Sequence, residues 1–198
     1  MRVLALALVL AVLSTTVQAQ SSGEAHLLHT PLNSALLSNF RIWDSKLDRW
    51  RPMRRGEAPG QRAPVLVLHI WADYCAPCRD EFPLVRDFAK QIETKYRDQV
   101  EFIYLSETSG SIEMAQFYAQ QHGRMPQGPH YQDSNEAIAA QLRQRMPTGE
   151  ISLPTTVLLD EQRVVRQVVI GSIGQRRTDL SSGISHLVAL TQHLRKTR

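Results

Sequence analysis

The chain has 198 residues, of which 42% are hydrophobic and 21% are charged. This composition excludes a disordered chain, and two cysteines are too few for a disulfide-rich miniprotein. The formal net charge is +4, from 23 basic and 19 acidic side chains. Because the arginines are scattered and no nucleic-acid-binding motif accompanies them, we expect no nucleic-acid partner.

Residues 1–19 have the pattern of a secretory signal peptide. Arg2 is followed by an apolar run over 3–13 that is too short to span a bilayer, and small residues then offer a cleavage site. We expect residues 20–39 to be an N-terminal leader and residues 40–198 to form one domain. The mature protein would work in the periplasm of a bacterium, with no stable membrane insertion. The alternative is a segment that stays uncleaved as an anchor.

The pattern of apolar residues predicts the elements of one α/β domain. Buried runs rich in β-branched residues and leucine predict strands, and apolar residues at helical spacing predict helices. In chain order we expect a hairpin over 40–51, a strand at 65–71, a helix at 78–96, a strand at 100–105, a helix at 112–121, a short strand within 126–131, a helix at 133–143 opened by a capping pair, strands at 155–159 and 164–170, and a helix at 180–194. The first strand–helix–strand unit implies a parallel pair, and the last two strands imply an antiparallel hairpin. The chain is therefore predicted to form a mixed sheet with helices on both faces.

The segment Trp71-Ala-Asp-Tyr-Cys75-Ala-Pro-Cys78 follows the first buried strand and opens the first long helix. Two cysteines at this spacing can close a disulfide across the first helical turn, where free N–H groups and the helix dipole favour a thiolate. A thiol pKa lowered from ~8.5 to about 6 would raise the ionised fraction at pH 7 from about 3% to about 90%. We therefore expect Cys75 to be the exposed nucleophile and Cys78 to be the covered, resolving thiol.

Two other uses of the cysteine pair are weaker. An inert structural disulfide would stabilise the fold very little, because it closes so short a loop. A zinc site would need two more ligands, and no second cysteine pair or paired-histidine spacing supplies them. We expect neither a metal nor an organic cofactor.

A second element, Leu153-Pro154-Thr-Thr, precedes a buried strand, where a proline can take a cis peptide bond. Together with the Trp-Ala-x-Tyr-Cys-Ala-Pro-Cys segment and the following Glu81-Phe-Pro, it resembles the thioredoxin superfamily, and more closely its periplasmic TlpA/ResA-like thiol-disulfide oxidoreductases. The resemblance covers about residues 40–194. It implies a thioredoxin-like fold with an N-terminal β-hairpin and a central αβ insertion. It also implies that Pro154 is the cis-proline packed against the disulfide, and that Leu153 offers backbone groups to an extended client peptide.

Three further residues are candidates for the site, each with a plainer alternative. Trp71 would be an aromatic wall beside the cysteines, or an ordinary core residue at the end of a strand. His69 stands six positions before Cys75, and it would be a core histidine bonded to a neighbour, or a proton relay to Cys78. Glu81 would be a surface carboxylate near the helix N-terminus or, by the resemblance, an acid that modulates cysteine protonation.

The resemblance implies a reductant dedicated to one client disulfide, as in cytochrome c maturation or copper-centre assembly. Its partners would be a client protein with a disulfide or thiol pair and a membrane thiol transporter that donates electrons. Cys75 would attack the client disulfide, and Cys78 would then release the client. Two alternatives stay open: an oxidase or isomerase of secreted proteins that runs the same chemistry in reverse, and a copper-binding metallochaperone that uses the thiols as soft ligands.

Overall fold

The computed structural model describes residues 22–47, 49–61, 63–107, 116–117, 120–121, 123–133 and 135–197. The predicted signal peptide lies outside the described residues, and so does most of the helix predicted at 112–121.

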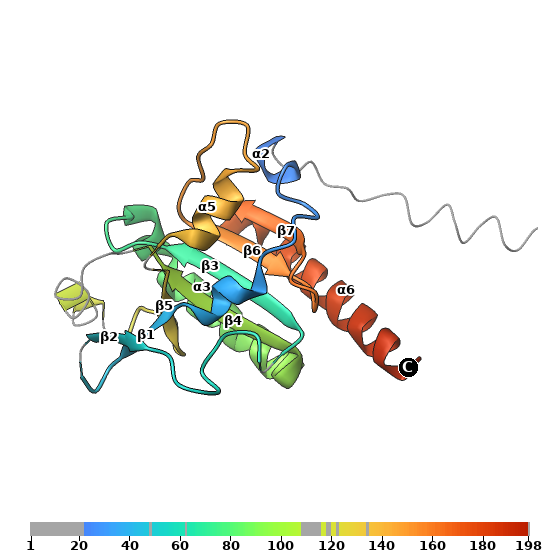
Figure 1. Ribbon diagram of the computed structural model, residues 1–198, viewed down its shortest axis with the longest axis horizontal. Coiled ribbons are helices and arrows are strands. Elements are labelled where there is room, and N and C mark those ends of the chain that lie inside the picture. The colour runs from blue at the N-terminus through green and yellow to red at the C-terminus, as the bar shows by residue number, and fades with distance from the viewer. Residues whose placement is uncertain are drawn as a thin grey trace, which may run out of the picture.

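The described residues form a seven-stranded mixed sheet with the order β2-β1-β5-β4-β3-β6-β7. The strands are β1 (Arg41–Asp44), β2 (Arg49–Pro52), β3 (Val65–Trp71), β4 (Val100–Ser106), β5 (His130–Gln132), β6 (Thr155–Leu159) and β7 (Val165–Ile170). β4 pairs in parallel with β3 and β5, whereas β6 pairs antiparallel with β3 and β7 (Figure 1). The N-terminal hairpin of β1 and β2 joins the sheet through β5. The predicted mixed sheet and the hairpin are confirmed.

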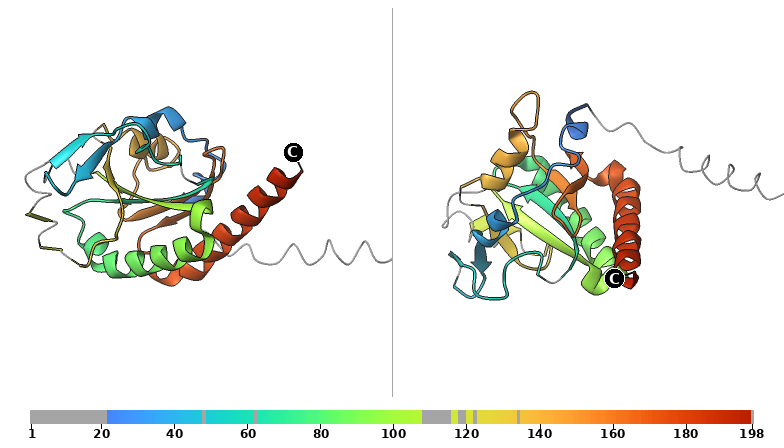
Figure 2. Two further views of the ribbon diagram at one scale, coloured as in Figure 1. Left: turned by 90° about the horizontal axis from the view of Figure 1, so that it is seen from below. Right: turned by 45° about the vertical axis from the view of Figure 1, so that its right-hand side comes forward.

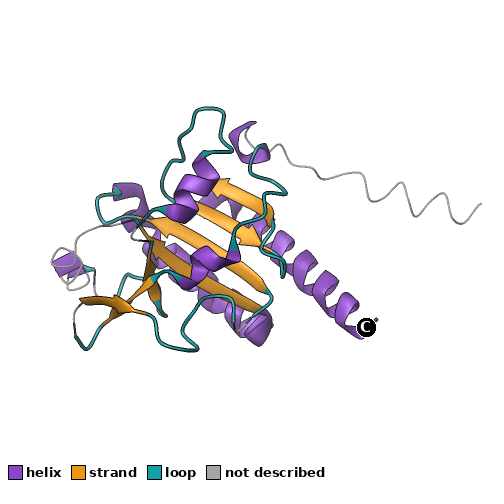
Figure 3. Cartoon of the chain, viewed as in Figure 1, coloured by secondary structure: helices purple, strands orange, loops and turns teal. Residues whose placement is uncertain are grey.

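Helices cover both faces of this sheet, as predicted (Figure 2, Figure 3). The α-helices are α2 (Ser22–Ala25), α3 (Ala76–Tyr96), α5 (Ala137–Arg143) and α6 (Arg177–Lys196), and the short 3-10 helices are η2 (Ser34–Ser38), η3 (Arg97–Gln99) and η4 (Gly174–Arg176). α3 and α6 pack on one face, and α5 and the N-terminal segment pack on the other.

The central strand β3 is buried along its whole length, which explains its nearly continuous apolar run. Successive side chains of a strand point to opposite faces. Val65 and Val67 accordingly contact the layer of α3 and α6, and Leu66 and Leu68 contact the opposite core. His69 continues the Val65–Val67 face, so the one polar residue of the strand points toward α3.

Three predicted helix starts are wrong. α6 begins at Arg177 rather than at residue 180, and the other two errors come from capping. α3 begins at Ala76 rather than at Cys78, because the Sγ of Cys75 accepts a hydrogen bond from the backbone N–H of Cys78 at 3.2 Å and caps the helix. α5 begins at Ala137 rather than at Asp133. Glu136 has a left-handed backbone (φ 49°) and makes no capping bond, whereas Asp133 alone accepts from the backbone N–H of Ile138 at 2.7 Å.

The described part of the predicted leader packs against β7. Leu27 and Leu32 are buried in the core of the α5 face. The backbone N–H of His29 donates to the carbonyl of Val165 at 2.8 Å, and the N–H of Val165 donates to the carbonyl of Thr30 at 2.9 Å. This segment therefore continues the hydrogen bonding of the sheet beyond its last strand.

Candidate active site

The two cysteines form a disulfide at the N-terminus of α3, directly after β3. Cys75 is the residue that precedes the helix, and Pro77 lies in the first turn, where a missing N–H costs no hydrogen bond. Cys75 keeps 7% of its surface exposed, whereas Cys78 is completely buried. Of the two cysteines, only Cys75 can therefore react with another protein.

The loop before β6 lies beside the exposed sulfur. The Leu153–Pro154 peptide bond is cis, at the position where the sequence allowed it. Pro154 is buried, and Leu153 is partly exposed and packs against the cluster of side chains that contains both cysteines. Leu153 and Cys75 line the same groove.

This groove has a volume of about 530 Å³, and we call it the Cys75 groove. Its lining comes from four separate parts of the chain: Tyr74, Cys75, Ala76, Pro77, Glu107, Glu136, Arg143, Ile151, Ser152 and Leu153. The side chains of Ile151 and Leu153 make it apolar on one part, and two carboxylates and one guanidinium make it polar on another. Tyr74, next to the nucleophile, is 71% exposed.

An aromatic cluster supports the disulfide from within the protein. Trp71 is completely buried, stacks on Phe117 with ring centroids 5.5 Å apart, and meets Phe82 edge to face at 5.2 Å. Both cysteines belong to the same cluster. Trp71 is thus a core residue at the end of β3 and also part of the wall behind the cysteines, so the two alternatives for it coincide.

His69 and Glu81 face each other between β3 and α3. The Nε2 of His69 lies 3.6 Å from the Oε1 of Glu81, and both side chains are buried. The Nδ1 of His69 is 3.0 Å from the Oγ1 of Thr156, its direct neighbour on β6. The Oε2 of Glu81 accepts a hydrogen bond from the backbone N–H of Ile173 at 3.0 Å. Glu81 is therefore not the surface carboxylate of the plainer alternative, and His69 is a core histidine bonded to a neighbour.

Burial sets the protonation of this pair. It lowers the pKa of His69 to about 4, and the nearby His130 adds to the effect. It raises the pKa of Glu81, against the opposing hydrogen bonds from Ser172 and the Ile173 backbone. In each case removal from water disfavours the charged form. Glu81 lies one helical turn after Cys78, which places the two residues on the same side of α3.

The sequence reasoning missed Glu107, Glu136 and Arg143. Glu107 follows β4 directly, and its backbone N–H donates to the carbonyl of Trp71 at 2.9 Å. The carboxyl ends of neighbouring parallel strands are where open α/β sheets bind ligands, and that rule would have nominated Glu107. Glu136 and Arg143 reach the groove only because α5 packs over it. No local sequence pattern predicts that packing.

Among the described residues, no group of three or more histidine, cysteine, aspartate or glutamate side chains is placed to hold a metal ion. A search of the helices in the described part of the chain finds none with the length and hydrophobicity needed to cross a membrane.

Comparison with known proteins agrees with this geometry. A family model described as Thioredoxin-like matches residues 64–165. No curated protein matches the sequence. Among solved structures, the chain is similar to DsbF of MTB (Mycobacterium tuberculosis), with a TM-score of 0.52, 17% identity, and coverage of 79% of this chain and 98% of the other. It is also similar to a thioredoxin-related protein from Neisseria meningitidis serogroup B, with a TM-score of 0.51, 19% identity, and coverage of 78% and 99%. At these identities the likeness concerns the fold.

Proposed function

The chain belongs to the thioredoxin-like family, and we propose that it is a thiol-disulfide oxidoreductase that reduces a client disulfide outside the cytoplasm. One observation carries the proposal. The Cys75–Cys78 disulfide lies at the N-terminus of α3, and only Cys75 opens into a groove that Leu153 also lines. A buried partner thiol and an exposed, helix-capping thiol are the two components that disulfide exchange requires.

The reaction runs in two exchanges. The Cys75 thiolate attacks one sulfur of the client disulfide, and the second client sulfur leaves as a thiolate. Cys78 then loses its proton and attacks the Cys75 sulfur, so that the client is released as a second thiolate and the Cys75–Cys78 bond forms. Two electrons pass to the client, and the helix N-terminus stabilises the negative charge on Cys75 before its attack.

The charges around the cysteines favour the reducing direction. Strong oxidants of this superfamily have a stabilised reduced form. Here the two residues between the cysteines, Ala76 and Pro77, carry no charge, and the buried group one turn beyond Cys78 is a carboxyl, Glu81. A neighbouring carboxyl opposes thiolate formation. A less stabilised reduced pair would be the better electron donor, which supports the proposed direction.

Glu81 and His69 are proposed as positioning residues for the second exchange. Cys78 has to lose its proton while it is fully buried, and Glu81 is a buried carboxyl one helical turn further along. The Nε2 of His69 faces the Glu81 carboxyl, and its Nδ1 is hydrogen-bonded to the hydroxyl of Thr156. One proton shared by the pair would move toward or away from Glu81 as the charge on Cys78 changes.

The proposed location and partners rest on the N-terminal sequence and on the motif resemblance. Residues 1–19 would direct export and be removed, and a membrane thiol transporter would keep the cysteines reduced. Expression of the full chain in a bacterium, followed by fractionation and mass measurement, tests the location. A periplasmic protein that begins near residue 20 is the expected result, and a full-length protein retained in the membrane fraction would replace the cleaved form by an anchored one.

Trapping of the mixed disulfide tests the activity itself. The Cys78→Ala variant should accumulate a covalent complex with its client through Cys75, and Cys75→Ala should accumulate none. The equilibrium of the wild-type pair with glutathione gives the direction. We expect a potential near the reducing end of the superfamily, about −270 mV, and a value near about −120 mV would identify an oxidase instead. Tight stoichiometric Cu(I) binding without any disulfide reduction would identify the metallochaperone.

A further inference from the structure

We propose that the Cys75 groove selects client segments that carry a lysine or arginine side chain close to the cysteine under attack. The inference rests on the proposed exchange at Cys75 and adds the chemical class of the client. It comes from three polar side chains of the groove, Glu107, Glu136 and Arg143, none of which takes part in the disulfide chemistry.

One guanidinium is shared between two carboxylates in this groove. An Nη2–Oε2 distance of 2.7 Å joins Arg143 to Glu136, and an Nη1–Oε1 distance of 3.9 Å joins it to Glu107. The first contact is a hydrogen-bonded ion pair, whereas the second is too long for a hydrogen bond. The three groups carry one excess negative charge when both carboxyls are ionised. The Cys75 thiolate adds another in the reduced protein.

An incoming cation would complete the charge compensation of the Glu107 carboxylate. Its side chain is only 7% exposed, yet it lines the groove. Its Oε1 is buried and accepts no hydrogen bond from any described residue. A buried carboxylate is costly unless a charged or hydrogen-bonding group compensates it. The raised pKa of Glu107, which burial causes, reflects this incomplete compensation.

The charged groups of the groove also act on Tyr74, which lines it. The exposed Tyr74 precedes the nucleophile, and its pKa is raised by burial and then by the charges of Glu107, Glu136 and Asp73, against the opposing charge of Arg143. The carboxylates therefore outweigh the guanidinium at the Tyr74 hydroxyl. An exposed aromatic ring in a negative field also suits a cation on its face.

The rest of the groove fits the stem of such a side chain. Ile151 and Leu153 provide an apolar surface, and the methylene chain of lysine or arginine packs on such surfaces while its charged end stays among polar groups. In an extended segment, residues two positions apart point to the same side. A basic residue two positions from the client cysteine would thus enter the same groove as the sulfur.

The test compares three homodimeric peptide disulfides that differ at one position. Each ten-residue peptide has one cysteine, with lysine, glutamine or glutamate two positions away. We measure the rate of their reduction by the reduced protein, and by NMR titration the affinity of the corresponding serine peptides for the oxidised protein. We expect the lysine peptide to react and bind about fivefold better than the glutamine peptide, which corresponds to ~1 kcal/mol, and the glutamate peptide to be the poorest. High salt should reduce the preference.

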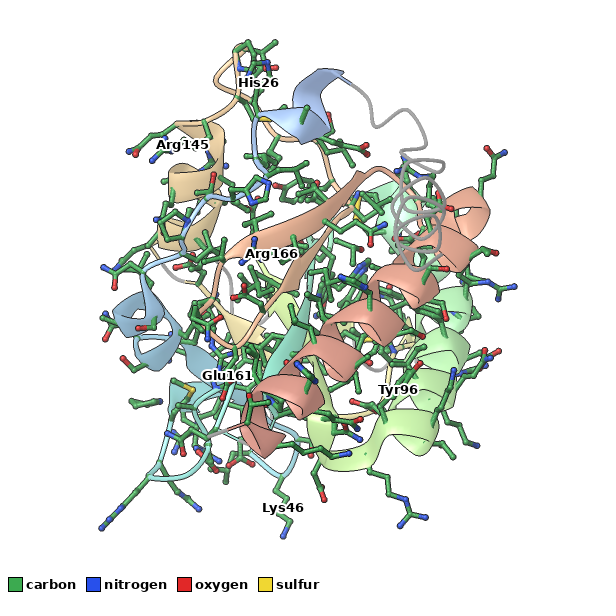
Figure 4. The ribbon with its side chains drawn as sticks, turned by 90° about the vertical axis from the view of Figure 1, so that its right-hand side faces the viewer. His26, Lys46, Tyr96, Arg145, Glu161 and Arg166 are labelled. Atoms are coloured by element: carbon green, nitrogen blue, oxygen red, sulfur yellow. A yellow bond between two sulfur atoms is a disulfide. The ribbon has the colours of Figure 1, made fainter. Side chains whose placement is uncertain are left out.

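Matched variants assign the preference to the groove. Glu107→Gln and Glu136→Gln should each bring the lysine-to-glutamine ratio toward one, and Arg143→Gln should increase it. The control is Glu161→Gln, in the turn between β6 and β7. Figure 4 shows Glu161 well below Arg145, which follows α5, and the control should keep the wild-type ratio.

The two readouts separate this inference from the proposed function. If none of the peptides is reduced but the lysine peptide still binds best, the oxidoreductase proposal fails and the charge selection stands. If all three peptides are reduced and bound equally well, the oxidoreductase proposal stands and the charge selection is overturned. A lysine preference that survives both glutamate substitutions would also overturn it, because the selecting charge would then lie elsewhere.

Discussion

His69 on β3 and Glu81 on α3 form a buried pair, 3.6 Å apart, that connects the centre of the sheet to the helix bearing Cys78. Each side chain has a second partner, Thr156 for the imidazole and the Ile173 backbone for the carboxyl. Burial disfavours the charged form of each side chain. A change of charge at the cysteines is therefore felt by two groups that solvent does not reach.

The substitution Glu81→Gln should lower the pKa of Cys78 by roughly half a unit to one unit, because it removes an ionisable acid one helical turn away. The pH dependence of thiolate absorbance in the reduced protein measures this shift. Glu93→Gln is the matched control, since Glu93 is also a partly buried carboxyl of α3 with a raised pKa but lies far along the helix. An unchanged Cys78 pKa would leave Glu81 with only the structural role of holding Ile173.

Folding stability should decrease as the pH falls from about 6.5 to about 4, in part because of His69. The folded-state pKa of His69 is depressed to about 4, so in this range the unfolded chain binds the proton and the folded chain does not. The contribution is up to ~1.4 kcal/mol per pH unit. Urea unfolding at several pH values should show a flatter dependence for His69→Asn. His130 has a similarly lowered pKa, so the variant that lacks both histidines should be flatter again.

Removal of the Trp71 ring should expose the resolving thiol. Trp71→Ala should cost about 3–5 kcal/mol of folding free energy and make Cys78 accessible to alkylation, measured in a Cys75→Ser background. Phe102→Ala is the control, because Phe102 is buried in the separate cluster between the sheet and α3. It should destabilise the protein to a similar extent and leave Cys78 protected. Equal labelling of Cys78 in both variants would mean that general loosening, rather than the lost wall, exposes the sulfur.

Gly60 should not tolerate a side chain. Its φ is +80°, and a Cβ atom would lie 2.7 Å from the Nη2 of Arg163, which itself donates to the Gly60 carbonyl. We expect Gly60→Ala to lower the free energy of unfolding by about 1–3 kcal/mol. Gly149→Ala, at φ +69° and with no atom within 4 Å of the new Cβ, should show the backbone cost alone. Thermal unfolding of the two variants separates the clash from the backbone strain.

The sequence predicted the features that depend on local pattern. The continuous apolar run of a buried central strand predicts β3 at its observed bounds, and the Cys75–Cys78 spacing predicts the disulfide at the start of α3. Two of the helix starts differ from the prediction because capping comes from an unusual source, the sulfur of Cys75 in one case and Asp133 acting from outside α5 in the other.

The charged part of the groove was not predictable in the same way. Glu107 follows β4, Glu136 directly precedes α5, and Arg143 is the last residue of α5. These residues meet only after the sheet has formed and α5 has packed over its edge. The burial of Glu81 is of the same kind, because the Ile173 backbone that covers its carboxyl lies 92 residues away.

The chain around Thr30 has a consequence for handling the protein. β7 is an outermost strand, and its backbone groups would attract another chain if they were bare. His29 and Thr30 occupy part of that edge through their bonds to Val165. A protein trimmed to begin at Phe40 would lose this protective cover and tend to aggregate, so preparations of the folded domain should retain the residues from Ser22 onward.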